Sequence, residues 1–284
     1  MENYLSPEKI KEYTVETGVK KAENSFKKSF LLSFMGGMFI SLAAIGSLIA
    51  SCTIDNYSIS SLVAGLVFAA GLIMVIVAGG DLFTGNVLLI LAVLQKRITA
   101  LKMAKNLAVT FFGNLMGALF IVFLIQGSGV LNSGNGIVGQ KLILKAAHKL
   151  EYPFIQAFML GILCNLLVSL AVWMMYSAKD TGGKVLACLF PIVLFIVGGY
   201  EHIVANMYYI PAGLVAAMSG KYELLSVIPS DVLSSFTLGG ILSNFIPVTL
   251  GNLVGGLVIG GVYANIFKSK SHAGEVINKI KISA

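Results

Sequence analysis

The sequence predicts an all-α transmembrane protein in which six spans form two inverted three-helix repeats. Of its 284 residues, 57% are apolar and only 12% are charged, whereas about a quarter are charged in an ordinary soluble domain. The 31 glycines lie mostly inside the apolar stretches, as expected where helices approach closely in lipid. Six stretches have the roughly 20 apolar residues that a helix needs to cross a bilayer. They are residues 30–51, 62–94, 106–126, 154–176, 185–219 and 235–267.

The segments on either side of the spans are polar. Residues 1–28 carry eleven charges of both signs and lack the short apolar core of a cleaved secretory signal. We expect an amphipathic cytoplasmic segment over residues 1–28, a six-span membrane domain over residues 29–267 and a cytoplasmic tail over residues 268–284.

The distribution of lysine and arginine predicts the orientation of the chain, because short cytoplasmic segments are enriched in these residues. With six spans and both termini inside, the cytoplasmic segments hold 16 of the 20 basic residues. The other four are Lys141, Lys145, Lys149 and Lys221. The sequence therefore predicts a multi-pass protein with both termini in the cytoplasm and an outer vestibule formed partly by residues 127–153.

Two of the six stretches are too long for one straight helix, and each has a polar middle that contains glycine. The middle of the second stretch runs from Gly79 to Asn86, and that of the fifth runs from Gly198 to Asn206. We interpret both as broken helices, whose free N–H and C=O groups need partners inside the protein.

A short motif indicates an internal repeat. Residues Phe112 to Gly117 (FGNLMG) in the third span match Leu250 to Gly255 (LGNLVG) in the sixth, and each follows a broken helix. Because each repeat has an odd number of spans, the second repeat must be inverted in the membrane. This arrangement predicts a pore or binding site on the axis between the two breaks.

Three ionisable residues lie at membrane depth, where a charge costs about 2.5–3.5 kcal/mol on insertion scales. Asp81 and Glu201 hold comparable places in the two breaks. We expect each carboxylate to cap the half-helix that follows it, with a functional role as the alternative. His202 is a neutral hydrogen-bonding group, a proton donor near physiological pH or a packed side chain bonded to a carbonyl.

Other candidate residues have weaker signals. Thr84 holds the matching position of the other break, where its hydroxyl caps the helix, donates to an anion or orients the imidazole. Lys149 is a solvated surface residue or a cation that attracts anions, and Asn165 bonds between helices or faces the pore. Apolar side chains near the breaks belong to the core, face lipid or form constrictions, and they are Phe68, Leu72, Leu82, Phe83 and Phe195.

The sequence has no signature of a soluble enzyme, because it lacks a phosphate-binding glycine loop and paired catalytic carboxylates. Cys52, Cys164 and Cys188 lie far apart and form neither a disulfide pattern nor a metal-ligand spacing. We expect no enzymatic activity, no cofactor and no metal. Because the basic residues lie between apolar runs, we also expect no nucleic-acid partner.

At these residues the chain resembles the formate/nitrite transporter family, including its hydrosulfide-channel branch. The resemblance covers nearly the whole chain. It is carried by Asp81 to Asn86 (DLFTGN), by Lys149 to Asn165 and, most specifically, by Glu201 to Met207 (EHIVANM) with Tyr209 to Pro211. It implies an aquaporin-like protomer in a homopentamer of a prokaryotic plasma membrane, with one pore per protomer for small monovalent anions.

The resemblance also implies roles for single residues. His202 is similar in position to the family's central histidine, Thr84 to its partner, Asn165 to a nearby amide and Lys149 to the lysine of the outer vestibule. The implied inner constriction comprises Leu72, Leu82 and Ala205, the outer one comprises Phe68 and Phe195, and the residues that support the breaks are Asp81, Glu201, Asn86 and Asn206. The segment 1–28 is then a mobile cover for the inner mouth.

Asp81 with Gly85 and Asn86 differs from the Glu and Ser/Thr that are more frequent in formate channels. We therefore expect a channel or transporter for hydrosulfide, with formate or nitrite as alternatives. In one mechanism Lys149 attracts the anion, desolvation makes it more basic, and a proton reaches it from or through His202. In another the anion crosses charged. A neutral-solute channel of the aquaporin kind, although without paired Asn-Pro-Ala motifs, and a scaffold without flux are competing hypotheses.

Overall fold

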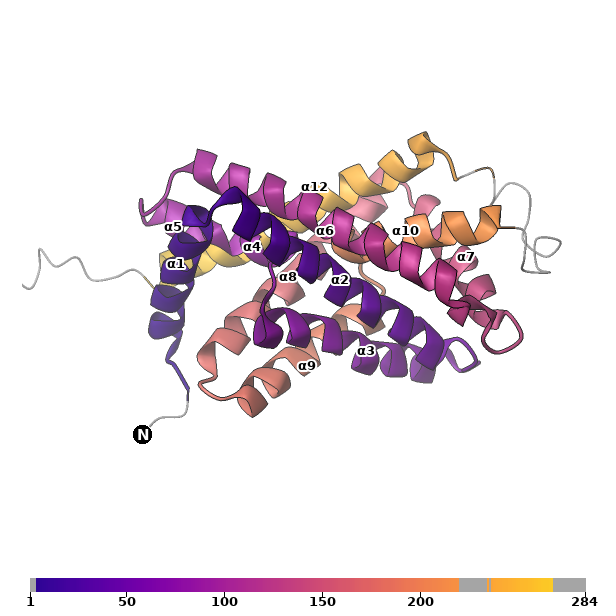
Figure 1. Ribbon diagram of the computed structural model, residues 1–284. Coiled ribbons are helices and arrows are strands. Elements are labelled where there is room, and N and C mark those ends of the chain that lie inside the picture. The colour runs from indigo at the N-terminus through magenta and orange to yellow at the C-terminus, as the bar shows by residue number, and fades with distance from the viewer. Residues whose placement is uncertain (1–3, 220–233, 235, 268–284) are drawn as a thin grey trace, which may run out of the picture.

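The computed structural model describes residues 4–219, 234 and 236–267 as an elongated helical bundle (Figure 1). The first half contains α1 (Pro7–Glu23), α2 (Phe26–Ser51), α3 (Tyr57–Met74), the π-helical turn η1 (Val75–Gly79), α4 (Phe83–Asn86), η2 (Val87–Leu89), α5 (Ile90–Leu94) and α6 (Ala100–Ser128). The second contains η3 (Val130–Asn132), α7 (Ile137–Leu150), α8 (Phe154–Ser177), α9 (Thr181–Val197), α10 (Ile203–Met218) and α12 (Leu238–Ile266). The expected tail 268–284 and Lys221 lie outside the described residues.

The helices expose many large apolar side chains, and polar side chains are buried among the apolar residues of the core. Among the described residues, five helices are long and apolar enough to cross a membrane, namely Phe26–Ser51, Tyr57–Gly79, Ala100–Ser128, Phe154–Ser177 and Leu238–Ile266. Shorter apolar helical segments span Phe83–Leu94, Thr181–Val197 and Ile203–Met218. Phe112, Phe123 and Phe190 are exposed on the surface, whereas Asp81 and Glu201 are buried. This distribution suits a surface that faces lipid or another apolar surface.

Short polar links set where the long helices begin. Ser25 caps α2, Asn56 caps α3 and Thr99 caps α6, because each side-chain oxygen accepts a hydrogen bond from the main-chain N–H three residues later. Thr237 caps α12 in the same way. These residues supply acceptors for N–H groups that the first turn of a helix leaves unpaired.

The helical path is interrupted twice inside the bundle. After α3 the chain turns at Gly79, where φ is +97°, and α4 begins at Phe83. After α9 it turns at Gly199, where φ is +65°, and α10 begins at Ile203. Glycine adopts these left-handed angles without a Cβ clash, so both turns depend on a glycine two residues before the buried carboxylate.

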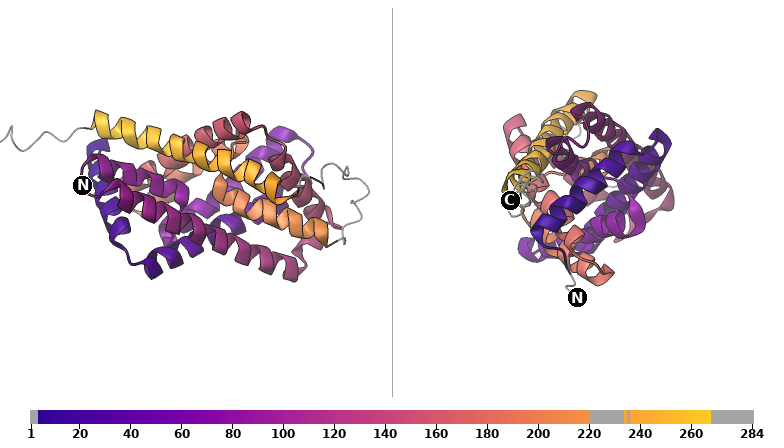
Figure 2. Two further views of the ribbon diagram at one scale, coloured as in Figure 1. Left: turned by 90° about the horizontal axis from the view of Figure 1, so that it is seen from above. Right: turned by 90° about the vertical axis from the view of Figure 1, so that its left-hand side faces the viewer.

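The two halves of the chain pack alike. Helix α2 lies against α6 as α8 lies against α12, and α3 lies beside α9. Helix α1 lies at one end of the bundle and α7 at the opposite end (Figure 1), and α12, in yellow, runs along much of its length in the left view of Figure 2. Gly117 and Gly255 allow the close packing, because a Cβ at either would overlap the main chain of the neighbouring helix.

Replacement of Gly251 by alanine tests this close packing. The added Cβ would overlap the carbonyl oxygen of Phe158, so α12 and α8 must separate. We expect Gly251→Ala to lower the free energy of unfolding by about 1–3 kcal/mol, the usual cost of overpacking. The midpoint of thermal unfolding in detergent measures the change.

Gly261→Ala is the matched control, because it lies in the same helix and a Cβ there meets no atom within 4 Å. Alanine is the better helix former by about 1 kcal/mol, so this variant should unfold at the same temperature or a higher one. Equal destabilisation by both substitutions would contradict the packing argument.

Candidate functional site

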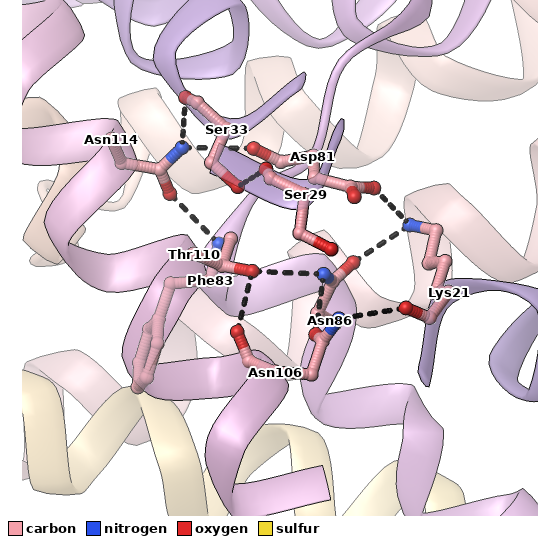
Figure 3. A network of polar contacts seen from close by, with 9 residues as sticks. All are labelled: Lys21, Ser29, Ser33, Asp81, Phe83, Asn86, Asn106, Thr110 and Asn114. Atoms are coloured by element: carbon pink, nitrogen blue, oxygen red, sulfur yellow. Dashed lines mark hydrogen bonds and ion pairs between the residues drawn. The ribbon is translucent and has the colours of Figure 1, made fainter. Parts of the chain in front are cut away.

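An asparagine from α6 holds the first interruption together. Asn114 Oδ1 accepts a hydrogen bond from the main-chain N–H of Phe83 at 2.9 Å, at the start of α4. Asn114 Nδ2 donates to the carbonyl oxygens of Ser33 at 2.7 Å and Asp81 at 2.8 Å (Figure 3). One side chain therefore links α2, α4 and α6.

An asparagine from α12 makes the same three bonds in the second interruption. Asn252 Oδ1 accepts from the main-chain N–H of Ile203 at 2.9 Å. Asn252 Nδ2 donates to the carbonyl oxygens of Gly161 at 2.8 Å and Glu201 at 2.9 Å. Both asparagines are fully buried, so each satisfies main-chain groups that water does not reach.

A lysine pairs with the carboxylate of each interruption. Lys21, at the end of α1, lies 2.8 Å from Asp81 Oδ1. Lys149, at the end of α7, lies 2.6 Å from Glu201 Oε1. Both carboxylates are buried, and a buried charge is tolerated when it is paired and hydrogen-bonded. The two ends of the bundle therefore carry equivalent ion pairs.

Two further asparagines surround each ion pair. At the α1 end, Asn86 accepts from Lys21 Nζ at 2.7 Å and donates to Asn106 at 2.9 Å (Figure 3). At the α7 end, Asn206 donates to Glu201 Oε2 and to Asn244, at 2.6 and 2.7 Å. Glutamate is one methylene longer than aspartate, which is why Glu201 reaches its asparagine, whereas Asp81 Oδ2 is buried without a hydrogen bond.

The prediction that the two buried carboxylates cap the following half-helices was wrong. Asp81 and Glu201 do not cap the half-helices that follow them, since the first N–H groups of α4 and α10 go to Asn114 and Asn252. The carboxylates instead bind the two lysines. In the sequence, the two asparagines are evident only as part of the repeated motif.

Several residues of the network were not predicted as site residues at all. They are Lys21, Asn106, Asn114, Asn244 and Asn252. The sequence contains a signal for the asparagines. The separation between Asn106 and Asn114 in α6 is the same as that between Asn244 and Asn252 in α12. Extending the FGNLMG match backwards along both helices would have found the second pair.

His202 lies where the two interruptions meet. Its Nδ1 accepts from the main-chain N–H of Ala205 at 3.2 Å, so the ring proton of the neutral imidazole is on Nε2. Nε2 lies 2.9 Å from Thr84 Oγ1. The imidazole thus caps α10 and donates to Thr84, and protonation of Nδ1 would break the cap.

The register of the two repeats differs from the one expected for Thr84. Asp81 matches Glu201, Phe83 matches Ile203 and therefore Thr84 matches Val204. His202 falls opposite Leu82. The prediction that Thr84 holds the position of His202 was wrong in register, although the two side chains do meet. They meet because α4 and α10, which follow the two interruptions, lie in contact.

Asn165 acts between helices in this structure. Its Nδ2 donates to the carbonyl oxygen of Asn252 at 2.5 Å and to that of Thr84 at 3.3 Å. Its Oδ1 lies 3.5 Å from Ser169 Oγ. The amide is fully buried, so it ties α8 to α12 and to the main chain that carries Thr84.

The aromatic candidates lie directly beside the histidine. The rings of Phe68 and Phe195 are 5.7 Å apart, and Phe195 lies 5.9 Å from the His202 ring. All three line a cavity of about 340 Å³ at the α7 end, called the α7 cavity below. Ala205 also lines this cavity, whereas the sequence analysis placed it with Leu72 and Leu82, which are buried in the core.

Polar residues also line the α7 cavity, and two of them are lysines of α7. Lys145 and Lys149 both lie over the ring of Tyr209, with Nζ 4.6 and 5.6 Å from its centroid. Burial lowers the pKa of Lys145, although the negative charge of Glu201 opposes this shift. Burial, with a contribution from Glu201, raises the pKa of Tyr152 to about 12, so its hydroxyl stays a donor.

Comparison with known proteins identifies relatives along nearly the full chain. The profile of the family described as "Formate/nitrite transporter" matches residues 8–266. The "Formate channel FocA" of Escherichia coli is 38% identical over 269 residues, which cover 93% of this chain and 94% of that protein.

Two solved structures share the fold. One is described as "Pentameric formate channel with formate bound", with a TM-score of 0.77, 32% identity and coverage of 85% of this chain and 96% of that chain. The other, an "FNT family ion channel", has a TM-score of 0.76, 31% identity and coverage of 89% and 96%. With the apolar helices, these relatives identify a multi-pass membrane protein of a transporter family.

Asn252→Leu tests the role of the asparagine. The substitution keeps the shape but leaves the N–H of Ile203 without its acceptor and removes the hydrogen bonds to the carbonyl oxygens of Gly161 and Glu201. Each unsatisfied buried group costs about 1–3 kcal/mol, so we expect a clear fall in the thermal unfolding midpoint in detergent. Asn265→Leu, at an exposed position of the same helix, should have little effect; equal midpoints for both variants would refute this role.

The ion pair at the α7 end gives a second stability prediction. Lys149→Met leaves Glu201 buried and unpaired, and breaking a buried pair costs about 3–5 kcal/mol. The double variant Lys149→Met/Glu201→Gln removes the charge and should recover most of the lost stability. The unfolding midpoints of both are compared with that of Lys141→Met, an exposed lysine of the same helix. A single variant as stable as the double would show that the charges are not coupled.

Proposed function

The chain belongs to the formate/nitrite transporter family, and on this basis we propose that it is a channel for small monovalent anions of weak acids. The observation that supports it most is the pair of Thr84 Oγ1 and His202 Nε2, 2.9 Å apart. His202 lines the α7 cavity beside the two aromatic rings, and the buried Thr84 lies next to it. Such a pair suits a site where a small anion loses water but keeps a hydrogen-bond donor.

We propose six spans, with both termini in the cytoplasm. In this arrangement the second span combines α3 with α4 to α5, and the fifth combines α9 with α10. The distribution of basic residues supports it. We also propose an aquaporin-like protomer in a homopentamer with exposed apolar side chains against lipid or neighbouring copies, since a relative of the same fold is described as pentameric.

The proposed route runs from the α7 cavity, as outer vestibule, past two apolar constrictions. Phe68 and Phe195 form the outer one. Leu72 and Leu82 form the inner one, with Ala205 at the level of the histidine. A bare anion loses several kcal/mol of hydration in such a passage, and desolvation raises its own pKa. A proton taken up from the solution in the vestibule then gives the neutral acid, which crosses more easily and releases the proton on the other side.

In this mechanism His202 donates a hydrogen bond and keeps its ring proton. Nδ1 is already an acceptor for Ala205, so the neutral ring cannot pass on the Nε2 proton without an unfavourable imidazolate. Asn165 holds the main chain of Thr84. Asp81 and Glu201, with Asn86 and Asn206, keep the interrupted helices in place.

Formate is the first substrate that the relatives suggest, because several are described as formate channels. Hydrosulfide is the second candidate, and nitrite the third. The hydrosulfide proposal is supported by the first break, which has Asp81, Gly85 and Asn86 where formate channels more often have Glu and Ser/Thr. All three are small anions of weak acids, so one pore suits them all.

We propose that the segment 1–28 covers the inner mouth. Leu5 N donates to the carbonyl oxygen of Ser177 at 2.8 Å, and Lys11 Nζ donates to that of Phe267. A cavity of about 440 Å³ lies beneath the segment, lined by Leu5, Lys21 and Gly79 among others. Displacement of α1 would open this cavity to the cytoplasm.

Flux into proteoliposomes tests the proposed function. Formate, nitrite, hydrosulfide and chloride are compared at about pH 6 and about pH 8, the range in which histidine sites are usually probed. We expect weak-acid anions to move faster at the lower pH and chloride, the anion of a strong acid, to move slowly. Thr84→Val and His202→Gln should each reduce formate flux about tenfold or more, the effect of losing a hydrogen bond to a charged group.

Thr53→Val, at an exposed position, is the control for Thr84→Val. Fast hydrosulfide with slow formate would select the second candidate. Flux of none of the anions would overturn the channel proposal, and unchanged flux in both site variants would overturn the assignment of Thr84 and His202. Equal flux at both pH values would favour passage of the charged anion.

A further inference from the structure

We propose that Lys145, and not Lys149, supplies the net positive charge that draws anions into the α7 cavity. The inference rests on the proposed function and adds to it an anion-binding position at the entrance, before the two phenylalanine rings. Lys149 is the lysine that the family resemblance puts in this role. The contacts in the cavity separate the two lysines clearly.

Lys149 is electrically compensated. Its Nζ lies 2.6 Å from Glu201 Oε1, and the side chains are only 10% and 3% exposed. Asn206 donates to the second oxygen of the same carboxylate. A buried pair of opposite charges has no net charge, so its field decays faster with distance than that of a single ion. An anion approaching from solution therefore gains little from Lys149.

Lys145 lies one helical turn earlier on α7, on the same face as Lys149. Among the described residues no carboxylate lies within ion-pair distance of its Nζ, which instead lies 4.6 Å from the centroid of the Tyr209 ring. Lys145 is partly exposed and lines the α7 cavity. It therefore combines an uncompensated charge with access to the solvent in the cavity.

The cavity offers the other groups that an anion needs. Ser60 and Ser61 are among the residues that line it, and so are the aromatic residues Phe68 and Phe195. Glu201 is the one carboxylate among the described residues that line the cavity, and it is the one that Lys149 compensates. A charge at the rim of an apolar-walled cavity raises the local concentration of anions.

Tyr209 positions both lysines. Its hydroxyl donates to the carbonyl oxygen of Ala44 at 3.0 Å, which fixes the ring under α7. The negative face of the ring attracts both ammonium groups. Glu201 holds Lys149 in place. Lys145 is held over the cavity by its contact with the Tyr209 ring.

The test compares Lys145→Gln with Lys141→Gln, an exposed lysine one turn earlier that does not line the cavity. Formate uptake by proteoliposomes is measured at ionic strengths of about 0.01 M and about 1 M, where charges are screened over roughly 30 Å and 3 Å. At low ionic strength we expect Lys145→Gln to raise the half-saturating formate concentration about threefold with the maximal rate unchanged. At high ionic strength the difference should vanish.

Lys145→Arg keeps the charge and should restore the wild-type value, which separates a charge effect from a structural one. Lys141→Gln should match the wild type. An unchanged half-saturating concentration in Lys145→Gln, or a shift that survives at high ionic strength, would overturn the proposal while leaving the channel function intact.

Saturation-transfer NMR with formate on the same purified variants reports occupancy of the cavity without passage. If the wild type carries no flux, the proposed function fails, and the inference is then decided by binding alone. A weaker signal in Lys145→Gln than in Lys141→Gln at low ionic strength supports it, and equal signals refute it.

Discussion

The structure depends on the pairing of main-chain groups that two interrupted helices expose inside an apolar bundle. Water does not reach these groups, and each unpaired one would cost several kcal/mol. Asn114 and Asn252 solve the problem in the same way, with one acceptor for the N–H at the helix start and two donated bonds to carbonyls. Gly117 allows α6 to approach α2, and Gly255 allows α12 to approach α8, closely enough for these contacts.

The charged residues form a second layer around this pairing. Lys21 with Asp81, and Lys149 with Glu201, place one ion pair at each end of the interrupted region. Each lysine comes from a helix outside the apolar spans, so α1 and α7 are fixed to the bundle by these contacts. The arrangement places a neutral ion pair near each end of the bundle.

The Thr84–His202 pair, which is the centre of the proposed site, lies where the two repeats differ. The residues that support the interruptions are repeated, as Asn86 and Asn206 show. In contrast, the position equivalent to His202 holds Leu82 in the first repeat, and the position equivalent to Thr84 holds Val204 in the second. A hydrogen-bonding pair is thereby formed across an otherwise symmetric apolar region. The repeated positions therefore build the fold, and the two positions that differ between the repeats form the polar pair.

The sequence alone determined the all-helical apolar character, the two glycine turns and the repeat, because these follow from composition, local backbone freedom and spacing. It also pointed to the formate/nitrite transporter family, which the comparisons confirm. Only the tertiary structure decided which side chain pairs with each buried carboxylate and with each helix start. The partner of Asp81 is 60 residues away in α1 and the cap of Phe83 is 31 residues away in α6. Such pairings depend on how the helices meet in space, and local sequence around a carboxylate cannot distinguish a cap from an ion pair.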